Sequence, residues 1–150
     1  MTGTEFSVRD PDYERRVRES FAAQSFMATL GAEIVALGPG RCDIRMAYAP
    51  GLLQQDGFLH AGALATIADS AAGYAAYTLM ESGDRVLSVE FKINLVRPAA
   101  GEAAVARARV VKPGRTITPC TAEVFAVRDG HETLCAVAQL TMIRIPPDGS

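Results

Sequence analysis

Apolar and polar residues alternate most regularly in the second half of the chain, which indicates β-strands. In residues 85–96 this alternation would place two sets of side chains on opposite faces of a sheet: Val89, Phe91, Ile93 and Leu95 on one, and Ser88, Glu90, Lys92 and Asn94 on the other. Three more apolar runs follow at residues 101–112, 116–128 and 132–145, separated by turns that contain Pro, Gly or Asp. Four strands joined by short turns predict an antiparallel meander.

The first half of the chain combines helices with a hairpin. Residues 61–80 are rich in alanine, contain no proline and carry few charges, so they predict a helix that is buried nearly all round. Before it, two short apolar runs flank a Gly-Pro-Gly turn and predict a β-hairpin over residues 32–48. Asp10 and Pro11 are typical of a helix start, and the apolar spacing after them predicts a partly exposed helix over about residues 11–30. The tail, about residues 146–150, is expected to fray.

Together these elements predict one α+β domain over residues 1–150, in which one curved antiparallel β-sheet wraps around a central helix. With 150 residues and 49% hydrophobic content, the chain has apolar surface for one core. A net charge of −2 gives no general attraction for nucleic acid, and no apolar stretch reaches membrane-spanning length. The N-terminal residues lack the apolar region of a signal peptide, so we expect a cytoplasmic protein. The scattered cysteines fit reduced core residues: Cys42, Cys120 and Cys135.

The candidate chemistry lies in residues 57–70, GFLHAGALATIADS, where an otherwise apolar run carries a histidine and an aspartate. If the helix begins near His60, Ala61 and Gly62 occupy its first turn, where backbone N–H groups lack intrahelical partners. The positive end of the helix dipole adds to their attraction for an anion or a polarised carbonyl oxygen. This is the arrangement of an oxyanion hole.

Asp69 follows His60 by nine residues, which is about half a turn around the helix and about 13 Å along it. The two side chains of one chain therefore cannot easily meet, and a site that uses both is most simply built by two subunits. The neighbours of Asp69 at helical spacing, including Gly62, Thr66 and Gly73, are small and would admit a thin ligand. The alternative is a close-packing face on which Asp69 bonds a hydroxyl.

Several of these residues form a pattern that extends beyond the helix. It consists of Gln54-x-x-Gly57-x-x-His60-Ala61-Gly62, Asp69, Ser88-Val89-Glu90 on the next strand and Val111-Lys112-Pro113-Gly114-Arg115 at a later turn. The pattern resembles the hotdog-fold acyl-CoA thioesterases of the phenylacetate-degradation (PaaI-like) type, over about residues 21–145. The spacing from the histidine to the aspartate is its most specific part.

The resemblance implies hydrolysis of a CoA thioester, with an aryl or a short- to medium-chain acyl group, to the free acid and CoA. The family's helical acid, here Asp69, serves as nucleophile or general base, and the residue after the histidine, here Ala61, offers its backbone N–H to the oxyanion. The family's usual asparagine falls on Gln54, whose amide would hold substrate or water, and Ser88 matches an assisting strand hydroxyl. The family's dimers build each site from both chains, so we expect a homodimer or a dimer of dimers.

Two departures from the family leave other functions open. His-Ala-Gly replaces the usual His-Gly-Gly, and Gln54 replaces asparagine. Alanine keeps the N–H that the hole needs, although its methyl group narrows the approach and would shift the preferred acyl group. A non-catalytic acyl-CoA or acyl-carrier binding module on the same fold is the alternative, and a hydratase or dehydratase is a third candidate.

Supporting roles are expected for the neighbours of these residues. His60 would hold the loop by donating to a backbone carbonyl rather than transfer protons. Hydrogen bonds from Thr66, Ser70 or the partner subunit's Ser88 would keep Asp69 ionised, which is the form that a nucleophile or base requires.

Binding of the CoA phosphates is expected to be local and basic. Residues 97–115 contain one acid, Glu102, and several cations that would form a positive patch: Arg97, Arg107, Arg109, Lys112 and Arg115. Arg107 and Arg109 taken singly fit solvated strand faces. The turn of Lys112, Gly114 and Arg115 matches the family's turn and is expected to bind phosphate through backbone N–H groups and cations. No metal is expected, because the two histidines are far apart in sequence, and no cofactor is expected beyond the CoA of the substrate.

Overall fold

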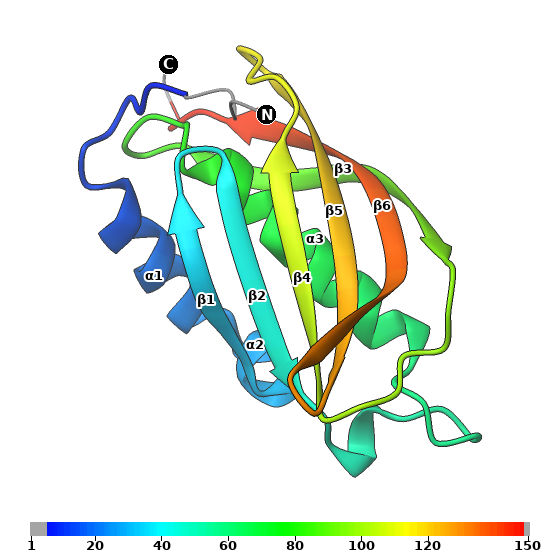
Figure 1. The fold of residues 1–150 in the computed structure, drawn as a ribbon. Helices are drawn as coiled ribbons and strands as arrows, with labels where there is room; N and C mark the ends of the chain where they lie inside the picture. Colours follow the sequence, from blue (N-terminus) through cyan, green and yellow to red (C-terminus); the bar gives the residue numbers. More distant parts are fainter. Residues whose placement is uncertain (1–5, 149–150) are drawn as a thin grey trace.

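The computed structural model describes residues 6–148 as a six-stranded antiparallel sheet that curves around helix α3 (Ala61–Tyr77) (Figure 1). Two short helices, α1 (Tyr13–Ala23) and α2 (Ser25–Leu30), lie beside the first strands. The strands are β1 (Ala32–Gly38), β2 (Arg41–Ala47), β3 (Arg85–Leu95), β4 (Ala103–Val110), β5 (Ile117–Arg128) and β6 (His131–Ile145), with a 3₁₀ turn at Pro50–Leu52. The predicted α+β class and the sheet around a central helix are confirmed.

The order of the strands differs from a meander. It is β1-β2-β4-β5-β6-β3, so β4, β5 and β6 follow one another while β3 lies at the far edge beside β6. The predicted four-strand meander is therefore wrong for β3. Alternation identifies a strand and its buried face but does not select its neighbours, and the connection at residues 96–102 carries the chain from β3 back to β4.

The predicted helix over about residues 11–30 is two helices. Gln24 has an extended backbone (φ −83°, ψ 95°) and interrupts them. The break rotates α2, so that Met27 is buried while Phe26 is 54% exposed. The helix start also lies later than predicted: Asp12 is the N-cap, and the Asp10 carboxylate accepts a hydrogen bond from its backbone N–H at 2.9 Å.

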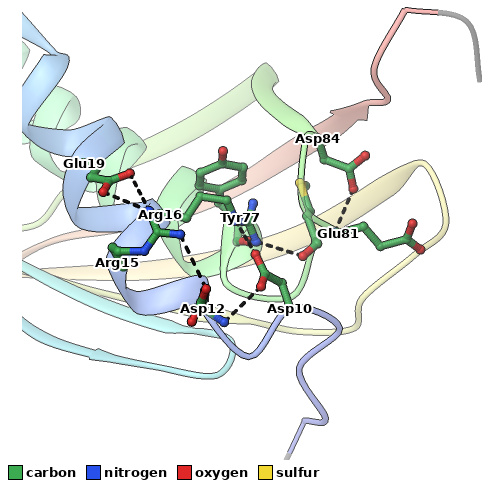
Figure 2. A network of polar contacts seen from close by, with 9 residues as sticks. Asp10, Asp12, Arg15, Arg16, Glu19, Tyr77, Glu81 and Asp84 are labelled. Atoms are coloured by element: carbon green, nitrogen blue, oxygen red, sulfur yellow. Dashed lines mark hydrogen bonds and ion pairs between the residues drawn. The ribbon is translucent and has the colours of Figure 1, made fainter.

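Arg16 fastens α1 to the C-terminal end of α3 (Figure 2). Its guanidinium pairs with Asp10 at 2.9 Å, donates to the backbone oxygens of Tyr77 and Met80 at 3.3 and 2.9 Å, and lies over the Tyr77 ring. A cation at this position interacts favourably with the negative end of the α3 dipole and with the carbonyl groups at and just beyond the helix end. The N-terminal helices are thereby held against α3.

Helix α3 forms the centre of the core, as its composition predicts. Its apolar residues are buried nearly all round and pack against β2, β4, β5, β6 and β3. The helix ends at Tyr77, three residues before the predicted end at residue 80. The three cysteines are buried and free, as expected, and burial raises the pKa of the Cys42 and Cys120 thiols to about 12.

Candidate active site

A tight loop positions the start of α3. Leu53 and Leu59 form an isolated antiparallel bridge, and the backbone N–H of His60 donates to the Leu52 carbonyl at 2.8 Å. Within the loop, the Gln54 side-chain oxygen accepts a hydrogen bond from the Asp56 backbone N–H. No partner is recorded within residues 6–148 for the side-chain NH₂ group of Gln54, so it stays available as a donor.

His60 caps α3 through its ring. Nδ1 accepts a hydrogen bond from the Gly62 backbone N–H at 2.8 Å, so the ring acts as acceptor rather than as the predicted donor to a carbonyl. A Cβ atom at position 62 would lie 3.0 Å from Nδ1, which explains the glycine there. Because the Gly62 N–H is used in this cap, the unpaired backbone donor of the first turn, within the described residues, is that of Ala61.

Asp69 is oriented by Ser88 of its own chain. The Ser88 hydroxyl donates to Oδ1 at 2.6 Å, while no described residue bonds Oδ2. The expectation that the partner subunit's Ser88 makes this bond is therefore wrong. Thr66 and Ser70 do not bond Asp69 either: Thr66 donates to the Gly62 carbonyl at 2.8 Å, and Ser70 donates to the Gln24 side chain at 3.5 Å.

A β-bulge allows Ser88 to reach α3. Ser88 pairs with Met142, whose side chain is buried, whereas Glu90 pairs with the adjacent Thr141, so the register shifts between them. Val89 is the extra residue. The strict alternation that placed Ser88 on the same face as Glu90 is wrong at this one position, because a bulge inverts the faces on either side of it.

The site residues gather in two separate hollows. A hollow of about 510 Å³ is lined by Gln54, Ala61 and Arg97, together with apolar residues of the loop and of the end of β3. A smaller cleft of about 150 Å³ is lined by Asp69 and Ser88. Gly62 and Thr66 line neither hollow. The separation agrees with the half-turn between His60 and Asp69.

The expected positive patch is divided between the two ends of β4. Arg97 precedes β4 and donates to the Leu134 carbonyl at 3.3 Å, whereas Lys112 and Arg115 follow β4, whose eight residues span roughly 26 Å. The prediction of a single positive patch over residues 97–115 is therefore wrong. Gly114 is required by its turn, since a Cβ atom there would lie 1.9 Å from the Ile117 carbonyl oxygen.

The two middle cations are ion-paired. Arg107 makes two hydrogen bonds of 2.6 Å to Glu132, and Arg109 binds the buried Asp43 at 2.7 Å. Their partners lie on β2 and β6, so local sequence does not reveal them. Lys112 and Arg115 are exposed and form no ion pair with a described residue.

Comparison with known proteins decides the family. The sequence model of the Thioesterase superfamily matches residues 56–135. The chain belongs to this superfamily. A thioesterase family protein from Silicibacter pomeroyi is 52% identical, with 89% of this chain and 98% of that chain covered and a TM-score of 0.88. A conserved protein of Pseudomonas aeruginosa is 30% identical over 85% of this chain and 98% of its own, with a TM-score of 0.77.

The PaaI protein of the E. coli phenylacetic acid degradation operon has the same fold. It is 21% identical over 91% of this chain and 95% of its own, with a TM-score of 0.80. The predicted hotdog fold and the PaaI-like resemblance are confirmed, and this thioesterase is a thioester hydrolase. Within residues 6–148 no helix is long and apolar enough to cross a membrane, and no cluster of His, Cys, Asp or Glu could hold a metal ion.

Sequence reasoning missed part of the Asp69 cleft. Ser20 of α1 and Gln24, at the break between α1 and α2, line it together with Tyr74 of α3. The N-terminal residues lie more than forty positions from Asp69 in the chain, and no local pattern links them to it. Gly73 also lines the cleft, and its place among the small neighbours of Asp69 was its one visible signal.

Proposed function

We propose that the protein hydrolyses acyl-CoA thioesters, with an aryl or a short- to medium-chain acyl group, at a site shared by two copies of the chain. Water adds to the thioester carbonyl, the new carbon–oxygen bond replaces the carbon–sulfur bond, and the CoA thiolate leaves and takes up a proton. The products are the free carboxylic acid and CoA.

The hydrogen bond between Ser88 and Asp69 carries this proposal. It holds Oδ1 at 2.6 Å, no described residue bonds Oδ2, and Asp69 lines the cleft. A carboxylate held in this way suits attack on the carbonyl carbon or removal of a proton from the attacking water. We assign Asp69 one of these two roles and Ser88 the orientation of the carboxylate.

The second half of the site is proposed to come from another copy. Its Ala61 N–H would donate to the developing oxyanion, and the Gln54 amide would hold the substrate or the water. His60 supports the hole by capping the helix through Gly62, so that the Ala61 N–H stays free.

The edge strand β3 supports pairing of two copies. Among residues 6–148 it has no neighbouring strand on one side, and its large apolar residues are between 46% and 60% exposed: Leu87, Val89, Phe91 and Leu95. Antiparallel two-fold pairing of β3 strands would set the Leu95 end of one strand beside the Arg85 end of the other. Leu95 borders the Ala61 hollow and Ser88 borders the Asp69 cleft, so this pairing would join the two halves.

The unpaired cations are proposed to bind the phosphates of CoA. Arg97 borders the Ala61 hollow, and Lys112 and Arg115 flank the Gly114 turn. Replacing Arg115 with alanine is expected to raise KM for acyl-CoA with kcat retained, whereas an unchanged KM would exclude the turn from binding.

Release of free thiol from a panel of aryl-, short- and medium-chain acyl-CoA substrates tests the function. Asp69→Asn and Asp69→Ala are expected to lose turnover by several orders of magnitude. After turnover in H₂¹⁸O, label in the peptide that contains Asp69 would identify Asp69 as the nucleophile. Saturable binding without turnover by the unaltered protein would contradict the proposal, and so would undiminished hydrolysis by Asp69→Asn.

A further inference from the structure

Gly73 leaves open space beside the proposed reacting carboxylate. It lies one helical turn after Asp69 on the same face of α3 and lines the same cleft. A Cβ atom at this position would meet no heavy atom within 4 Å. Glycine inside a helix is less stable than alanine, so neither helix formation nor close packing within this chain accounts for it.

The cleft ends at the N-terminal helices. Tyr74 is buried, its hydroxyl lies 3.3 Å from that of Ser20, and its ring meets Phe21 edge-on at 5.7 Å. These contacts hold one wall of the cleft in place. This wall and Asp69 thus border one small space that Gly73 also lines.

Gln24 places an amide on this side of the cleft. It occupies the N-cap position of α2 but makes no side-chain capping bond there. Its side chain is directed to α3 instead, where Oε1 accepts the 3.5 Å hydrogen bond from Ser70, and no described residue bonds its NH₂ group. The break between α1 and α2 therefore presents a polar group to the cleft.

We propose that Gly73 and Gln24 select the acyl group of the substrate. The missing side chain of Gly73 leaves a channel that the acyl group occupies, and Gln24 hydrogen-bonds a polar substituent at the end of the acyl group. The inference rests on the proposed function. With the thioester carbonyl at Asp69 and the CoA arm directed to the hollow beside Arg97, the acyl group extends into the remaining space. A cavity of about 150 Å³ holds one benzene ring, so this cleft suits acyl groups of about six carbon atoms.

Matched substrates and variants test the channel. The substrates are acetyl-, hexanoyl- and 6-hydroxyhexanoyl-CoA. Gly73→Leu is expected to lower the ratio of kcat/KM for hexanoyl-CoA to that for acetyl-CoA by about tenfold or more, because its side chain fills the channel. Gly73→Ala is expected to lower the same ratio less and to raise the thermal unfolding temperature, which guards against a folding defect.

Gln24→Leu removes the side-chain amide from the cleft and keeps a side chain of similar volume. It is expected to lower the preference for 6-hydroxyhexanoyl- over hexanoyl-CoA by about 3- to 10-fold, since one hydrogen bond is lost. Gly38→Leu is the matched control, because Gly38 lies in β1 outside both hollows and a Cβ atom there also meets nothing within 4 Å. This control is expected to leave both ratios unchanged.

Binding of S-hexyl-CoA, a thioether that cannot be hydrolysed, separates this inference from the proposed function. If the unaltered protein hydrolyses no thioester but Gly73→Leu weakens S-hexyl-CoA binding relative to S-methyl-CoA, the channel stands and the proposed function fails. If turnover occurs and both ratios stay unchanged in Gly73→Leu and Gln24→Leu, the channel assignment is overturned. A chain-length change produced by Leu64→Phe in the Ala61 hollow, and not by Gly73→Leu, would place the acyl group there instead.

Discussion

Replacing Ser88 with alanine tests the bond on which the proposed site depends. The Ser88 hydroxyl donates to the Asp69 carboxylate at 2.6 Å. Without it, the carboxylate loses its one protein partner among the described residues and is free to rotate. We expect a lower kcat with a small change in KM, because the substrate contacts of the other half-site are untouched.

The expected fall in kcat follows from the charge of the Asp69 carboxylate, which accepts the hydrogen bond, and from the exposure of Ser88, which donates it. A hydrogen bond to a charged group contributes about 1.5–3 kcal/mol, and water replaces part of it because Ser88 is exposed in the single chain. The lower part of this range, about 1.5–2 kcal/mol, corresponds to a fall in kcat of about 10- to 30-fold.

Steady-state thiol release measures kcat and KM for the variant and its controls. Ser88→Thr keeps the hydroxyl and is expected to recover most of the activity, whereas Ser82→Ala, at an exposed turn serine, is expected to behave as the unaltered protein. Urea unfolding should place Ser88→Ala within about 1 kcal/mol of the unaltered protein. A kcat within threefold of the unaltered value, with Asp69→Asn inactive, would refute the orienting role of Ser88.

Three further predictions concern the supports of the site. His60→Ala removes the cap of α3 and is expected to lower the free energy of unfolding by about 1 kcal/mol in urea, while His60→Asn keeps a capping oxygen; equal losses in both would contradict the capping role. Arg16→Ala leaves a largely buried carboxylate and two carbonyls without their cation, and about 3 kcal/mol of stability is expected to be lost, more than in Arg16→Lys; a loss below 1 kcal/mol would show that the pairing is weak. Burial raises the pKa of the Cys42 and Cys120 thiols to about 12, so above pH 9 the unfolded chain releases protons that the native protein keeps. The stability that this burial contributes is therefore fully present below pH 9, and the free energy of unfolding is expected to fall by about 1 kcal/mol per pH unit for each thiol between pH 9 and 12. In the double variant Cys42→Val/Cys120→Val the free energy of unfolding is expected to fall less steeply with pH; an equally steep fall would assign the loss to other groups.

The position of Ser88 shows where pattern analysis stops. Period-two alternation correctly placed Phe91 and Ile93 on one face of the sheet, because their pairing with β6 is regular. One unpaired residue, Val89, inverted the faces before it. A bulge has no strong signature in a single sequence, so the bond between Ser88 and Asp69 within one chain could not be derived from alternation.

The sequence by itself determined the features that depend on local geometry. The alanine-rich, proline-free composition was enough to predict a helix from about residue 61, where α3 begins. Helix geometry then separated His60 from Asp69 by half a turn, because each residue of a helix advances by a constant rotation and rise. Only the tertiary structure decided which distant residues meet. The place of β3 at the sheet edge, the separation of Arg97 from Arg115, and the approach of Gln24 to the cleft of Asp69 all depend on how the strands and the N-terminal helices pack around α3. Such contacts join residues far apart in the chain, and they are selected by burial of the whole core rather than by any local spacing.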